Sequence, residues 1–146
     1  MKNQLRRLSA ALLALMLLAG CGEKGSEDGN VLDPENPVTI SVWTYYNGAQ
    51  FTAFSDLVDA FNTTVGKEQG IVVEGFSQGS VNDLESYVLS AAQGKVGAGK
   101  VPNIFAAYAD TAYEIDRLGM LADLGEYLTT EEQQAYIAAY LDEGRF

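Results

Sequence analysis

The chain has 146 residues, 47% of them hydrophobic, and a formal net charge of −11 at pH 7. This excess of acidic groups argues against nucleic acid as a partner, because phosphate backbones attract basic surfaces and repel acidic ones. With no histidine and one cysteine, the chain lacks the commonest general base and metal ligand and cannot form an internal disulfide.

The first twenty residues have the pattern of a secretory signal peptide. Lys2, Arg6 and Arg7 form a basic start, and the apolar run over 8–19 is interrupted only by Ser9. A basic region, a short apolar region and small residues at its end are typical of such signals. The run is too short for a permanent spanning helix, which needs about 20 apolar residues. We therefore expect residues 1–20 to be a signal peptide.

The cysteine lies directly after this segment, in the sequence Leu18-Ala19-Gly20-Cys21. LAGC resembles the bacterial lipobox, which implies that the Cys21 thiol carries diacylglycerol, with acyl chains such as palmitate, and becomes the new N-terminus. Acyl chains contribute about 0.8 kcal/mol per buried CH₂. The expectation is a lipoprotein anchored by its lipid to the extracytoplasmic face of the cell membrane.

The next segment, residues 21–37, is rich in glycine, proline and acidic residues and has little to bury. Such a composition predicts a flexible tether. Loss of residues 1–20 removes three positive charges and no negative one, which takes the formal charge from −11 to −14. Residues 21–146 are enough for one domain.

Two strands and a helix are predicted at the start of this domain. VTISVW at 38–43 and IVVEGF at 71–76 are β-rich runs. Between them, apolar side chains recur at helical spacing, and Gly66 marks the expected end of that helix. These apolar positions are Phe51, Phe54, Leu57, Val58 and Phe61.

A second helix and a third strand follow. Ser80 and Asp83 have the spacing of a capping box, which predicts the start of the helix. The apolar positions of this helix share one face: Leu84, Val88 and Ala91. After a glycine-rich loop, NIFAAYA at 103–109 predicts the third strand.

Two more capping-box patterns, Thr111–Glu114 and Thr129–Glu132, predict further helices. The first helix is expected to end at Gly119. The second is expected to be one final helix, with apolar positions at Tyr136, Ile137, Tyr140 and Leu141.

Alternation of strands and helices predicts the α/β class, with a parallel βαβαβ sheet flanked by helices. Three strands make a narrow sheet with exposed edges, and the chain stops directly after a helix. Residues 38–146 are therefore expected to be the N-terminal portion of a longer, truncated protein.

Polar and aromatic side chains follow all three predicted strands, at the edge where open parallel sheets bind ligands. They are Tyr45, Tyr46 and Asn47 after the first strand, Gln78 and Ser80 after the second, and Tyr108 and Asp110 after the third. Aromatic faces cover the C–H faces of sugar rings, and amide and carboxylate groups bond their hydroxyls. This edge suits a sugar or another polyol.

Structural roles remain open for these residues. Ser80 and Asp110 can cap helices, Asn47 can serve a turn, and strand parity allows one of Tyr45 and Tyr46 to face the ligand while the other packs. The helix N-termini at the same edge would favour an anionic group such as phosphate.

Signals for catalysis and cofactors are weak. No zinc or calcium spacing appears, and the acidic residues are spread over predicted helix surfaces. We expect no enzyme activity and no cofactor. The alternative in another class is a lipid-anchored glycoside hydrolase that uses a pair of carboxylates.

An ordered set of segments covers residues 38–142: VTISVW before a Tyr/Asn turn, FSDLVDAFN, IVVEGFSQGS, and the stretch from AAQGK to LGEYL. This set resembles the N-terminal lobe of extracellular solute-binding proteins of bacterial ABC importers, in the group that takes up carbohydrates.

The resemblance implies a type II periplasmic-binding-protein-like lobe. It implies a monomer that captures a sugar-like solute and delivers it to ABC permease subunits for carbohydrate transport, with glycerol phosphate or a sugar phosphate as the alternative ligand. The ligand loops of the family fall on the seven strand-end residues named above.

Overall fold

The computed structural model describes residues 32–145 of the chain. The predicted signal peptide 1–20, the lipidation site Cys21 and most of the predicted tether 21–37 lie outside the described residues. None of the helices between residues 32 and 145 has the length and apolar character needed to cross a membrane.

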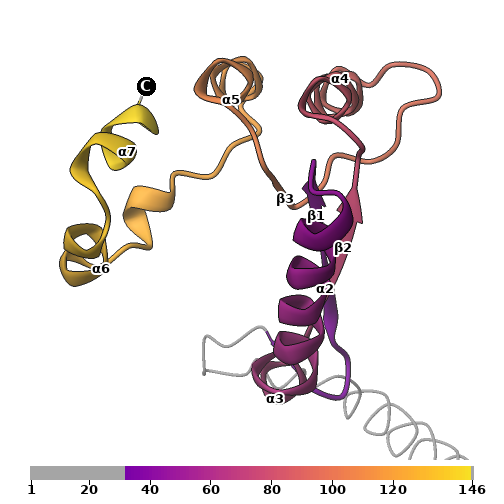
Figure 1. Ribbon diagram of the computed structural model, residues 1–146, viewed down its shortest axis with the longest axis vertical. Helices are drawn as coiled ribbons and strands as arrows, with labels where there is room; N and C mark the ends of the chain where they lie inside the picture. Colours follow the sequence, from indigo (N-terminus) through magenta and orange to yellow (C-terminus); the bar gives the residue numbers. More distant parts are fainter. Residues whose placement is uncertain (1–31, 146) are drawn as a thin grey trace, which may run out of the picture. The chain divides into compact units, whose positions relative to one another are not determined.

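A three-stranded parallel sheet forms the centre of the described chain (Figure 1). Its strands are β1 (Val38–Thr44), β2 (Ile71–Ser77) and β3 (Ile104–Phe105), in the spatial order β2-β1-β3. β1 pairs with β2 along its whole length and with β3 through two residues. The predicted α/β class and the parallel sheet flanked by helices are confirmed.

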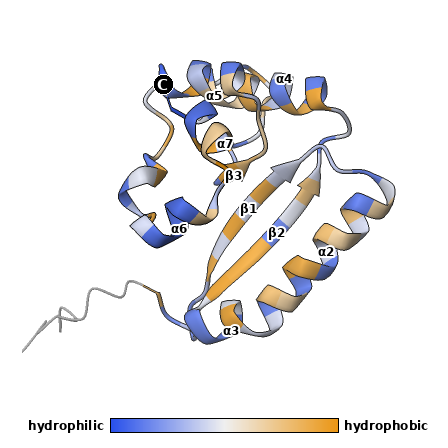
Figure 2. Cartoon of the chain, turned by 60° about the vertical axis from the view of Figure 1, so that its left-hand side comes forward, coloured by the Kyte–Doolittle hydropathy of each residue, from blue (hydrophilic) through white to orange (hydrophobic). Residues whose placement is uncertain are grey.

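One face of the sheet is covered by α2 (Gly48–Thr63), which runs beside β1 and β2 (Figure 2). The Phe54 ring lies so close to Gly75 of β2 that a Cβ there would overlap it. Asn62 adds two hydrogen bonds to the backbone of Val73, donating to its carbonyl oxygen (2.9 Å) and accepting from its N–H (2.8 Å). The amide side chain therefore acts as a short piece of strand on the outer edge of β2.

The buried core lies on the opposite face, beneath α4 (Val81–Ala92) and α5 (Ala109–Asp116). Its buried members are Leu84, Val88, Ala92 and Ile115. Trp43 and Phe105, which are paired across β1 and β3 and so share a face, pack against this cluster. The predicted apolar face of the second helix is confirmed, because Leu84, Val88 and Ala91 are all buried.

The first helix does not end near Gly66 as predicted. α2 ends at Thr63, and a second short helix, α3 (Val65–Gln69), contains the buried Gly66. The residue that ends the segment is Gly70, with φ of +73°, a conformation that a side chain disfavours. A Cβ at Gly70 would also overlap the backbone of Asp33.

Residues at the end of the predicted tether form a turn at this contact. The Asp33 carboxylate accepts hydrogen bonds from the Asn36 amide (2.8 Å) and the Glu35 N–H (2.9 Å). These bonds lower the pKa of Asp33 below its ordinary value of 3.8, and the bond from Asn36 has the larger effect.

The third strand is much shorter than the predicted 103–109. Ala106 N donates to Trp43 O (3.0 Å), and past this point β1 has ended, so the chain has no strand to pair with. α5 starts at Ala109. The predicted capping box at Thr111–Glu114 is therefore wrong, and Thr111 lies buried in the first turn of α5.

The last segment holds a 3₁₀ turn, η1 (Leu124–Glu126), and two short helices, α6 (Thr130–Ala135) and α7 (Ala138–Glu143). The capping box of Thr129 and Glu132 is confirmed. The predicted single final helix is wrong, because Tyr136 is extended and separates α6 from α7. None of the residues in these three elements is buried, so no packing holds one continuous helix together.

Candidate ligand-binding site

The loops that follow β1 and β2 are joined by hydrogen bonds into one unit. The Asn47 amide donates to the carbonyl oxygens of Tyr45 (3.0 Å) and Gly79, and its oxygen accepts from the Ser77 hydroxyl (3.3 Å). Gln78 N donates to Thr44 O (2.7 Å). The polar atoms of Asn47 are thus used within the scaffold of this edge.

Ser80 is engaged in the same way at the start of α4. Its hydroxyl accepts from Asp83 N (3.2 Å) and donates to the Asp83 carboxylate (2.6 Å), which also accepts from Ser80 N (3.2 Å). This reciprocal pair satisfies N–H groups that the first turn of a helix leaves free. The predicted capping box is confirmed, and it uses the side chain of Ser80.

The two tyrosines after β1 contact each other edge to face, with ring centroids 5.2 Å apart, and each also packs against a different part of the chain. The Tyr46 ring packs edge-on against Phe54 of α2, with centroids 5.8 Å apart. Tyr45 packs against the buried cluster beneath α4 and α5. Of the pair, Tyr45 is the one that lines a cavity.

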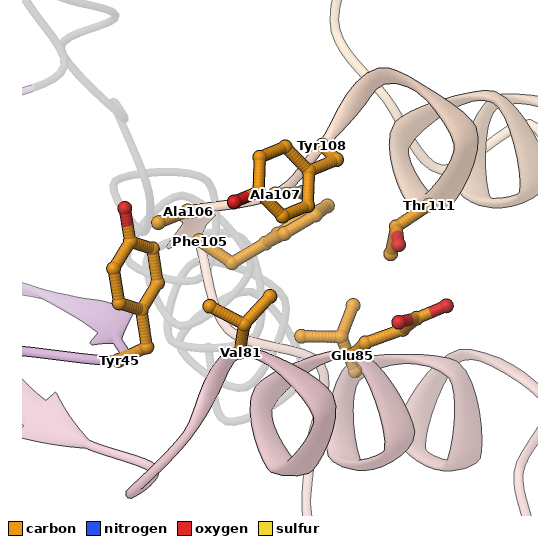
Figure 3. A pocket seen from close by; sticks show the side chains of 9 residues that line it. Tyr45, Val81, Glu85, Phe105, Ala106, Ala107, Tyr108 and Thr111 are labelled. Atoms are coloured by element: carbon orange, nitrogen blue, oxygen red, sulfur yellow. The ribbon is translucent and has the colours of Figure 1, made fainter.

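This cavity, of about 320 Å³, lies at the carboxyl ends of β1 and β3 and beneath α4 and α5 (Figure 3). Its apolar wall consists of Val81, Val88, Phe105, Ala106 and Ala107. Its remaining lining residues carry polar groups: Tyr45, Glu85, Tyr108 and Thr111. The volume falls within the usual range for small-molecule sites, about 300–1,000 Å³.

The position of the cavity follows from the strand order. The chain passes from β1 to β2 on one side of the sheet and from β2 to β3 on the other, so the order reverses between β1 and β3. Crevices of open α/β sheets open where the strand order reverses, and ligands bind there. Tyr45 and Tyr108 follow the two strands that border this point.

Two polar groups in the cavity have no partner within the described chain. Thr111 as a residue is only 4% exposed, and no hydrogen bond joins its hydroxyl to residues 32–145, although the hydroxyl oxygen is not a buried atom left without a partner. Glu85 is half-buried as a residue, and its carboxylate makes neither a hydrogen bond nor an ion pair with residues 32–145. Figure 3 shows both at one end of the cavity, with the Glu85 carboxylate directed toward Thr111, and Tyr45 at the other end.

The structure thus brings two of the seven predicted ligand residues, Tyr45 and Tyr108, to one cavity. Asp110 accepts from Thr111 N (2.8 Å) at the start of α5. The others do not line this cavity: Tyr46, Asn47, Gln78, Ser80 and Asp110. Their part in ligand binding stays a prediction.

Sequence reasoning did not find Glu85 or Thr111. The spacing of Val81, Glu85 and Val88, four and then three residues, places Glu85 on the same helix face as two apolar residues. An acidic residue on such a face was the available signal. Within the described residues no group of three or more His, Cys, Asp and Glu could hold a metal ion.

No model of a known protein family and no curated protein sequence matches the chain. A solved structure does: the cyclic α-maltosyl-1,6-maltose binding protein from Arthrobacter globiformis, at 23% identity and a TM-score of 0.51. The match covers 66% of this chain and 22% of that one, so the chain corresponds to a minor part of that protein. The likeness shows the fold: this α/β unit, a three-stranded parallel sheet flanked by helices, is the fold of part of a carbohydrate-binding protein.

Proposed function

We propose that this protein is the solute-binding component of an ABC importer, which captures a sugar or related polyol outside the membrane and delivers it to a permease. The observation that carries the proposal is the cavity between β1 and β3. It combines the aromatic side chains of Tyr45 and Tyr108 with two polar groups that have no hydrogen-bond or ion-pair partner among residues 32–145. Sugars need both, an apolar surface for ring C–H groups and fixed partners for hydroxyls.

The fold supports the same function. The solved structure that shares it is named for its binding of a cyclic maltose-derived sugar. Fold alone does not determine function, but here the cavity occupies the edge at which this class of sheet binds ligands. A protein that binds and releases its solute unchanged fits both observations.

Calorimetric titration of the full chain with a panel of polyols, including maltose and glucose, tests this function. Tyr108 is the residue to change first because it is 65% exposed, so its loss costs little stability. Tyr108→Ala should weaken binding about tenfold, equal to about 1.4 kcal/mol. Tyr87→Ala, an exposed tyrosine of α4 outside the cavity, is the control and should bind as the unaltered chain does.

Absence of heat with every polyol would contradict the proposal. Equal weakening of polyol binding by Tyr108→Ala and Tyr87→Ala would show that the cavity is not the binding site. Chromatography of the same samples distinguishes binding from hydrolysis. Glycoside hydrolysis uses two carboxylates, whereas among the described residues that line the cavity Glu85 supplies the one carboxylate. We expect the sugar to be recovered intact.

The proposal includes a lipid anchor at Cys21 and a location on the extracytoplasmic face of the cell membrane. Support comes from the LAGC sequence and the short apolar segment before it. An anchor raises the concentration of the binding protein near a permease. Labelled palmitate should be incorporated by the unaltered chain and not by Cys21→Ser. Equal labelling of the two chains would contradict the anchor.

A further inference from the structure

The charge of the candidate site points to the class of solute that it accepts. We propose that Glu85 is the specificity-determining residue of the cavity and makes it select hydroxylated solutes without negative charge, against sugar phosphates and sugar acids. The inference rests on the proposed function, since it concerns the same cavity.

The first argument is the unbalanced charge of Glu85. Glu85 is a half-buried residue, and its carboxylate has no ion-pair partner among residues 32–145, where the ion pair present joins the exposed Arg145 and Asp142. Among the described residues that line the cavity there is no lysine or arginine. An anionic ligand would meet a like charge with no compensating cation.

The second argument is hydrogen-bond chemistry. An ionised carboxylate only accepts hydrogen bonds, and a hydroxyl both donates and accepts. A ligand with neighbouring hydroxyls can donate to Glu85 and also bond the hydroxyl of Thr111, which makes no hydrogen bond with residues 32–145. A phosphate or carboxylate oxygen can accept from Thr111, but it has no proton to donate to Glu85 at neutral pH. At this position a hydroxyl group therefore satisfies both Glu85 and Thr111, whereas a phosphate or carboxylate group satisfies Thr111 alone.

The third argument concerns the helix N-termini, which otherwise favour anions. At α4 the Asp83 carboxylate already lies over the first turn and accepts from Ser80 N. At α5 the Asp110 carboxylate accepts from Thr111 N at 2.8 Å. Both helix starts therefore already carry a negative charge from the chain's own carboxylates, which repels a further anion.

The test compares two matched pairs of probes by calorimetric titration: glucose with glucuronate, and glucose with glucose 6-phosphate. The unaltered chain should bind glucose at least about tenfold more tightly than either anion, and 0.5 M salt should narrow that ratio by screening. In Glu85→Gln, which keeps the shape of the side chain, the ratio should fall to within about threefold through a gain in anion affinity. Glu114→Gln removes the same charge from an exposed site on α5 outside the cavity and should leave the ratio unchanged.

Equal binding of glucose and its anions by the unaltered chain would overturn the inference and leave the proposed function standing. An equal fall in the ratio of glucose affinity to anion affinity in Glu85→Gln and Glu114→Gln would also overturn the inference. The net charge of the protein, and not Glu85, would then be the cause of the selectivity. If no probe and no polyol binds, the proposed function itself fails and the inference falls with it. Circular dichroism melting confirms that both variants are folded.

Discussion

Individual glycine and asparagine residues connect the elements of this chain at points that secondary structure alone leaves open. Gly70 closes the α3 segment in a left-handed conformation and lies against the backbone of Asp33. Asn62 completes the hydrogen bonds of Val73 at the outer edge of β2. Both contacts are specific to a residue type, so both predict substitutions with defined costs.

Gly70→Ala should lower the free energy of unfolding by about 2–3 kcal/mol, because it adds left-handed strain and an overlap with the Asp33 backbone. Gly97→Ala isolates the first effect: Gly97 has φ of +84°, and nothing lies within 4 Å of its would-be Cβ. That control should cost about 1 kcal/mol. Urea unfolding measures both, and equal losses would show that the contact with Asp33 contributes nothing.

Asn62→Ala should lower the free energy of unfolding by about 1–2 kcal/mol, since two hydrogen bonds to the Val73 backbone are lost. Asn62→Asp keeps an acceptor for Val73 N but places a negative oxygen beside Val73 O, so it should not restore stability. Thermal unfolding of both variants measures the effect. Full stability of the aspartate variant would contradict a role for the donated bond.

Helix starts and strand lengths show how much could be read from the sequence at the scale of elements. Ser80 and Thr129 were found because a capping box is a local pattern that hydrogen bonds then complete. Thr111 has the same pattern by chance, and its place inside α5 depends on where β1 ends, which is not local information. Tyr136 interrupts the last helix for a related reason: apolar spacing predicts a helix only where something covers the apolar face.

The capping box of α6 predicts a pH dependence. Hydrogen bonds from the Thr129 N–H and then its hydroxyl lower the pKa of Glu132 below its ordinary value of 4.5. A carboxyl whose pKa is depressed by folding stabilises the folded state above the ordinary value, and this contribution is lost as the pH falls through the lowered one. NMR titration should show the pKa of Glu132 rise toward 4.5 in Thr129→Ala. Thr130→Ala, the exposed neighbour, is the control and should leave it low.

At the scale of the whole described chain, burial is unevenly distributed. α4 contributes four buried residues, whereas η1, α6 and α7 contribute none. Several side chains of the last segment remain more than half exposed: Leu124, Tyr127, Tyr136, Ile137 and Tyr140. The edge where the cavity forms was predictable from the parallel strands, and the spacing of Val81, Glu85 and Val88 gave the helix face of Glu85, but whether that face meets the cavity depends on how α4 and α5 pack together.

This distribution predicts unequal hydrogen exchange. Amides of α6 and α7 should exchange about a hundredfold or more faster than those of β1 and α4, since little apolar contact must break to expose them. Hydrogen–deuterium exchange with mass spectrometry resolves these segments. Equal protection across the chain would mean that burial in residues 32–145 does not govern local opening.

The hydrogen bonds of Asn47 and Ser80 have a consequence for how such a protein diversifies. These side chains hold the strand-end loops and the start of α4 by hydrogen bonds. Within residues 32–145, the Glu85 carboxylate and the Thr111 hydroxyl make no such bonds. Scaffold and recognition therefore reside in different side chains. Under the proposed function, single replacements at the cavity would change the bound solute and leave this frame unaltered.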